Sequence, residues 1–148
     1  MTIRDEIVDA IVSAINAADP TGVQAERDKM HPVDNTGLLP SIGVYLGRED
    51  TAAPSPSGGK WGHLAEHMLS VKIEILAFGK PVTKALDPLA ARVVKAISGQ
   101  EFGGLANRIF IGSKQWTYND TDRQVCELAL DVAVEYTTAA KDEALLTD

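Results

Sequence analysis

The chain has 148 residues, of which 45% are hydrophobic, 24% charged and only 5% aromatic, and its formal net charge at pH 7 is −7. This length suffices for one domain, spanning residues 1–148, with a substantial hydrophobic core. The negative charge would repel a phosphate backbone, which argues against tight binding of nucleic acid.

Cysteine content and the N-terminal residues indicate the compartment. A single cysteine, Cys126, excludes an internal disulfide framework and is consistent with a reducing environment. The acidic residues Asp5, Glu6 and Asp9 stand where a signal peptide would carry basic ones, and no apolar stretch reaches transmembrane length. We therefore expect a cytoplasmic protein with no membrane partner.

Two segments have the apolar spacing of an amphipathic helix. In residues 2–17, apolar residues recur every three to four positions, Thr2 can cap the start, and the helix should end at Asp19 because Pro20 follows it. The second helix should open at Asp87-Pro88, where proline is tolerated in the first turn, and close at residues 98–99. A start one turn earlier, at Thr83, is the alternative, but it would place Pro88 deep in the helix.

Four segments alternate apolar and polar residues with the period of two that is typical of a β-strand. The clearest is residues 125–137, whose one side carries Cys126, Leu128, Leu130, Val132, Val134 and Tyr136. Residues 69–77 and 107–118 follow the same pattern, as do residues 41–47, where Leu46 should share the apolar face. Residues 23–26 and 30–33 are weaker and predict short edge strands or irregular chain.

The remaining segments contain turn residues. Residues 48–62 are rich in proline, serine and glycine and predict one long, flexible loop, and residues 139–148 form a short charged tail that can fray. The order of elements predicts an α+β domain, with a single mostly antiparallel sheet and two helices packed on one face. Its expected core contains Ile7, Ile11, Val93, Ile97, Ile73, Leu130 and Val132.

The sharpest chemical pattern is His63-Leu-Ala-Glu66-His67, which matches the H-x-x-E-H arrangement of some zinc proteases. That arrangement needs a stable helix and a third protein ligand, whereas glycines precede it here and a strand follows at once. The residues predict no metal and no cofactor. Glu127 and Asp131 share one strand face, where a solvated or interface surface is favoured over acid–base catalysis because no apolar pocket accompanies them. We expect a protein that is not an enzyme.

The order of several motifs resembles the tail terminator proteins of long-tailed phages, the lambda-like minor tail protein family. The resemblance begins with the strand at residues 39–46 and the charged residues 48–50 that follow it. It continues through residues 71–75, 86–90 and 115–118 and ends at Tyr136-Thr137. It covers residues 2–138 and rests on structural alternations, since no catalytic signature is shared. The proline- and serine-rich loop and the tail after residue 138 depart from the family pattern.

The resemblance implies an α+β subunit that is monomeric when dilute and closes into a hexameric ring on the tail tube. Such a ring stops tube polymerisation and offers a surface to head-completion and neck proteins, while DNA passes through it without tight binding. It would be made in the host cytoplasm and end in the virion tail, and its source would be a phage, a prophage or a tail-derived bacteriocin.

Two alternatives stay open: another neck or tail-assembly component of related fold, and a small α+β enzyme or ligand-binding protein. For the ring, the expected assembly interface combines the charged loop with the polar sheet face: Arg48, Glu49, Asp50, Lys60, Trp61, Lys72, Glu74, Glu127, Asp131 and Glu135.

Overall fold

The computed structural model of the chain describes residues 2–28, 40–52, 64–78, 82–118 and 125–139. Its elements follow in the order α1 (Ile3–Ala18), β1 (Ala25–Arg27), β2 (Ser41–Ala52), β3 (Leu64–Phe78), α2 (Val82–Ile97), η3 (Phe102–Gly104), β4 (Arg108–Tyr118) and β5 (Val125–Ala139). Neither helix in this part of the chain is long and apolar enough to cross a membrane.

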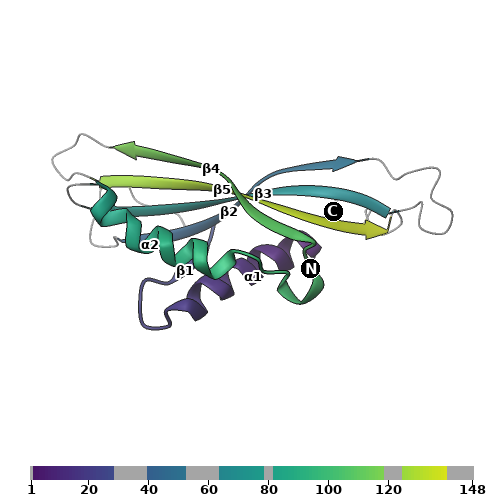
Figure 1. The fold of residues 1–148 in the computed structure, drawn as a ribbon, viewed down its shortest axis with the longest axis horizontal. Coiled ribbons are helices and arrows are strands. Elements are labelled where there is room, and N and C mark those ends of the chain that lie inside the picture. The colour runs from purple at the N-terminus through teal and green to yellow at the C-terminus, as the bar shows by residue number, and fades with distance from the viewer. Residues whose placement is uncertain (1, 29–39, 53–63, 79–81, 119–124, 140–148) are drawn as a thin grey trace.

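The strands form one five-stranded sheet in the order β1-β2-β3-β5-β4. Every neighbouring pair is antiparallel except β1 and β2, which run parallel. Both helices lie on the same side of the sheet, and the end of the sheet that holds the end of β5 extends past them (Figure 1). The predicted α+β class is therefore confirmed, and β1 is the short edge strand that residues 23–26 suggested. The second weak segment, residues 30–33, lies outside the described residues.

Helix α1 begins as the sequence predicted. The Thr2 side chain accepts a hydrogen bond from the backbone N–H of Asp5, and Asp19 is the C-terminal cap before Pro20. Beyond that cap, Arg92 of α2 donates to the carbonyl oxygens of Ile15, Asp19 and Val23. This one guanidinium satisfies carbonyl groups at the end of α1 and ties the two helices together.

Helix α2 starts at Val82, so the preferred opening at Asp87-Pro88 was wrong and the alternative start at Thr83 was nearly correct. Leu86, which is fully buried, extends the apolar stripe to a position two residues before the proline. Pro88 removes one helical N–H, whose partner would be the carbonyl of Lys84. Lys84 is exposed, so water can satisfy that carbonyl.

The core lies between the helices and the sheet. All seven residues predicted for it are at most 1% exposed and belong to one buried cluster, which also includes the apolar sides of β3 and β5. The alternation read from residues 125–137 is confirmed, since Cys126, Leu128, Leu130, Val132, Val134 and Tyr136 are all buried.

Two β-bulges interrupt the sheet, one in the β2–β3 ladder and one in the β4–β5 ladder. In β2, Leu46 pairs with Val71 and Glu49 with Leu69, so both Gly47 and Arg48 stand opposite Ser70. In β4, the register shifts between Ile111 and Ser113, which leaves Gly112 unpaired. The bulges lie at nearly the same level of the β3–β5 ladder, and Figure 1 shows strong twist near that level, as expected because bulges increase twist locally.

The first bulge also corrects the predicted boundary of the long loop. Arg48–Ala52 belong to β2, because the ladder with β3 resumes after the bulge and continues to Ala52. Residues 53–62 of the expected loop contain no described structure, since residues 53–63 lie outside the described part of the chain.

Candidate functional site

The face of the sheet that points away from the helices, here called the outer face, holds most of the polar residues predicted for assembly. Lys72 and Glu74 of β3 lie on it beside Glu127, Asp131 and Glu135 of β5. Lys72 pairs directly with Asp131, and Glu135 pairs with Met68. Successive side chains of a strand point to opposite faces, and these five alternate with the buried residues, so all five lie on the same surface.

The carboxylates of this face repel one another at its centre. Burial, followed by the nearby charge of Glu74, raises the pKa of Glu127, while Lys72 opposes the shift. The Lys72 Nζ lies 3.6 Å from Glu74 Oε2 and compensates only part of the negative charge. Burial also raises the pKa of Tyr45, with Glu74 adding to the shift. The centre of the outer face is therefore acidic and partly desolvated.

Polar side chains near the bulges also form hydrogen bonds with one another. The Ser70 hydroxyl donates to the Asp131 carboxylate, which links β3 with β5. Within β2, the exposed Arg48 guanidinium donates to Asp50 Oδ1 at 3.1 and 2.8 Å. Arg48 and Asp50 are thus solvent-accessible, as an interface residue must be.

Glu49 behaves differently from its two neighbours. The bulge puts Glu49 opposite Leu69, so its side chain lies on the helix side of the sheet. There it accepts a hydrogen bond from the Tyr136 hydroxyl, and its Oε2 lies 3.7 Å from Arg4 Nη1 of α1. Glu49 was predicted as an assembly residue on an open loop, but its contacts are internal ones.

His67 belongs to the same internal network. It is 3% exposed, stacks on the Tyr136 ring at 4.5 Å between centroids, and lies 3.9 Å from Glu49. Its Nδ1 is 3.1 Å from the Thr51 hydroxyl and its Nε2 is 2.7 Å from the Thr138 hydroxyl. Both ring nitrogens therefore have hydroxyl partners.

This network bears on the H-x-x-E-H pattern. His67 lies on a strand, so it shares a buried side with Ala65 while Glu66 is exposed on the opposite side. His63 is outside the described residues. Among the residues that are described, no three or more His, Cys, Asp or Glu side chains group closely enough to hold a metal ion.

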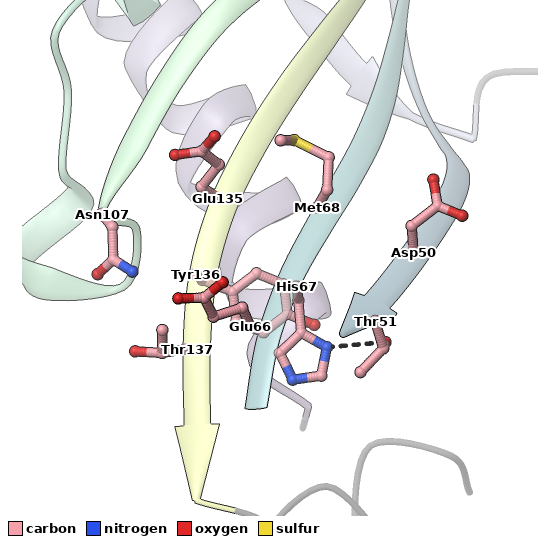
Figure 2. A pocket seen from close by; sticks show the side chains of 9 residues that line it. All are labelled: Asp50, Thr51, Glu66, His67, Met68, Asn107, Glu135, Tyr136 and Thr137. Atoms are coloured by element: carbon pink, nitrogen blue, oxygen red, sulfur yellow. Dashed lines mark hydrogen bonds between the residues drawn. The ribbon is translucent and has the colours of Figure 1, made fainter. Parts of the chain in front are cut away.

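A pocket of about 460 Å³ lies near the end of β5, beside the ends of β2 and β3 that pair with it or with each other there. Figure 2 shows its lining from β2, β3 and β5, together with a residue just before β4: Asp50, Thr51, Glu66, His67, Met68, Asn107, Glu135, Tyr136 and Thr137. Asp50, Met68 and Glu135 are cross-strand neighbours on the outer face. Three carboxylates, including Glu66, surround one methionine, an arrangement suited to a cationic group with an aliphatic stem.

Two exposed apolar side chains were not predicted from the sequence. Leu46, expected in the core, and Trp116 are each 41% exposed. Both lie on the helix side, opposite Val71 and Leu128 respectively. Leu46 is on β2, beyond the residues that the short strand β1 pairs with, and Trp116 is on the edge strand β4, and the helices leave both exposed. The glycines Gly47 and Gly112 were the available signal, since glycine within a strand often marks a bulge. The predicted interface residues Lys60 and Trp61 lie outside the described part of the chain.

The chain was compared with known proteins. It matches no protein-family model and no curated protein. Among solved structures, it is similar to a chain from the virion of a native gene transfer agent (GTA) particle. The two chains share a fold. The likeness has a TM-score of 0.60 at 16% sequence identity and covers 93% of this chain and 98% of the virion chain.

Proposed function

We propose that the chain is a structural subunit of a phage-like particle, and that it caps the tail tube as a hexameric ring. The ring ends tube polymerisation and provides the surface to which the head joins. The observation that carries this proposal is the fold shared with a virion protein over almost the full length of both chains. The motif order that resembles tail terminators supports the finer assignment.

The outer face fits this role. Its centre bears Glu74, Glu127 and Asp131, with Lys72 as the neighbouring cation. Lining a ring with such a surface would let DNA pass without adhering, because phosphates gain nothing from contact with carboxylates. We propose that the subunit is made in the host cytoplasm, is not an enzyme, and binds other copies of itself, the tail tube protein and the neck proteins.

The proposal is tested by deleting the gene for this chain from the genome that encodes the particle. We expect overlong tails without heads in electron micrographs, and tails of normal length when the wild-type chain is restored. Normal tails after deletion would contradict the proposal.

Variants then test the interface. Asp50→Lys reverses an exposed charge in β2 and should fold normally yet leave overlong tails. Lys95→Glu, at an exposed position on the far helix α2, is the control and should complement. If Asp50→Lys complements fully, Asp50 is not part of the interface. Glu49→Lys is not informative, because its charge is bonded inside the subunit and reversal would destabilise the fold.

The deletion also separates the proposed role from that of another neck component. A neck or head-joining protein of the same fold would leave tails of normal length that lack heads, whereas loss of a terminator changes the length itself.

The pocket favours one different candidate, a protein that binds a small cationic ligand. Asp50, Glu66 and Glu135 would hold the positive charge of such a ligand. The test is the thermal midpoint with arginine or spermidine present. A saturable increase that Glu135→Gln removes would favour this candidate, and an unchanged midpoint would exclude these ligands.

A further inference from the structure

The two outer edges of the sheet are complementary. In the described part of the chain, β4 pairs only with β5, and β2 is covered by β1 only along residues 42–44. The ladder edges of β2 from Leu46 onward and of β4 thus carry backbone groups with no strand beside them among the described residues. Such edges readily accept another strand.

The direction of the strands favours head-to-tail contact. Since β2, β3, β5 and β4 are successively antiparallel, β2 and β4 run in opposite directions. A second copy related by rotation about an axis roughly along the strands would place its β4 antiparallel to β2 of the first copy. That pairing continues the antiparallel pattern of the sheet.

The exposed apolar side chains mark the same two edges. Leu46 on β2 and Trp116 on β4 point to the same side of the sheet, so a continuous sheet would place them on one surface. Their levels differ by four residues of β5, Val132 against Leu128. If Leu46 of one copy lies level with Trp116 of the next, the sheet shifts by four residues, at about 3.3 Å each, for every four strands, which are spaced about 4.8 Å apart. The strands of such a continued sheet would be tilted by about 35° from the axis of the ring. Closed sheets typically have tilts of about 35–45°.

Charge also distinguishes the edges. Strand β4 carries the basic residues Arg108 and Lys114 and no acidic residue. At the opposite edge, Glu26, Asp28 and Asp50 are exposed, and two arginines accompany them: Arg27 pairs with Asp28, and Arg48 pairs with Asp50. Three exposed acidic residues against two arginines leave this edge slightly acidic, so a contact with the basic β4 edge would bring surfaces of opposite net charge together.

We infer that copies of this chain associate head-to-tail through the β2 edge of one and the β4 edge of the next, with Leu46 and Trp116 buried in the contact. The inference rests on the proposed ring and specifies its subunit interface. Two other contacts could cover these edges. One is a two-fold dimer that pairs identical edges, and the other is a strand supplied by a different protein.

Cross-linking of single-cysteine additions tests the pairing. Leu46→Cys and Trp116→Cys are purified separately with different tags, mixed at high concentration and treated with a short bis-maleimide reagent. We expect cross-linked pairs that contain one of each variant and none from either variant alone. The wild type should give no product because Cys126 is buried, and Lys95→Cys mixed with Leu46→Cys should give none because α2 lies away from the edges.

Cross-links within one variant would show a two-fold contact and overturn the inference. The absence of a mixed product at the highest concentration would overturn it as well, including the case where the edge accepts only a foreign strand.

A second measurement uses the wild-type interface directly. In sedimentation experiments, Trp116→Ala should raise the dissociation constant for self-association about tenfold or more, as is usual for a central aromatic contact. Thr117→Ala, the exposed neighbour on the opposite side of β4, should change it little. An unchanged constant for Trp116→Ala would exclude this contact.

These tests separate the two proposals. If the chain restores tail length but does not cross-link, the proposed function stands and the proposed interface is wrong. If the chain cross-links as expected but does not affect tail length, the proposed interface stands and the terminator role is wrong.

Discussion

At the scale of single residues, Glu49 and Asp50 show how much one position matters. They are adjacent acidic residues, and their composition and hydropathy do not distinguish them. The bulge before them turns Glu49 toward Tyr136 and Arg4 and leaves Asp50 exposed beside Arg48. Sequence alternation could not assign these sides, because the phase of the alternation changes within the strand.

Glu127 gives a residue-scale prediction about pH. Its folded-state pKa is raised above the ordinary value of 4.5, so its ionised form opposes folding once the pH exceeds that value. We expect Glu127→Gln to be more stable than the wild type at pH 7, because a neutral amide avoids the burial of a charge and the repulsion from Glu74. The gain should vanish as the pH falls to about 4.5, where the unfolded chain also holds the proton.

Urea denaturation midpoints measured from pH 4 to 8 would check this. Glu66→Gln, an exposed carboxylate on the same face, is the control for loss of a surface charge. A Glu127→Gln difference that stays constant over the whole pH range would contradict the assigned cause.

At the scale of elements, regular periodicity predicted most of the fold. Both helices and the long strands were found near the expected positions, because isoleucine and leucine stripes recur at periods that only one backbone conformation can bury together. The bulges at Gly47 and Gly112 and the exposed positions of Leu46 and Trp116 were not predicted, and the early start of α2 before Pro88 was considered only as an alternative. Each depends on pairing with a distant strand or helix, which local spacing does not contain.

The two bulges lead to an element-scale prediction. A Cβ atom at Gly47 would lie 2.9 Å from the backbone oxygen of Ser70, whereas one at Gly112 would lie 3.3 Å from the backbone oxygen of Asp131. We expect Gly47→Ala to lower the free energy of unfolding by about 1–3 kcal/mol, the usual cost of overpacking. Gly112→Ala, the matched variant in the other bulge, should cost distinctly less.

Chemical denaturation of both variants is the measurement. If both variants lose the same free energy of unfolding, the β2 strand can shift as easily as β4 to make room for a Cβ atom. The short distance to the Ser70 oxygen would then not limit the choice of residue at position 47.

At the scale of the whole molecule, one buried cluster joins the sheet to both helices. Leu130 lies within it and is fully buried. We expect Leu130→Ala to lower the free energy of unfolding by about 2–5 kcal/mol, through lost transfer energy and the cavity that remains. Thermal and urea unfolding should report the loss together for helix and sheet signals.

Gln115→Ala, an exposed change on the neighbouring strand, is the control and should stay within about 0.5 kcal/mol of the wild type. A Leu130→Ala midpoint equal to that of the control would mean that this side of β5 does not hold the core.

The position of β5 within the sheet affects how the chain is made. β5 is the last described strand to leave the ribosome, yet it lies between β3 and β4 and holds contacts such as that of Thr138 with His67, 71 residues away. Until residues 125–139 have been synthesised, the apolar side of β3 lacks its neighbour and β4 has no described strand to join. Folding is therefore deferred until late in translation, and the nascent chain exposes strand edges that chaperones recognise.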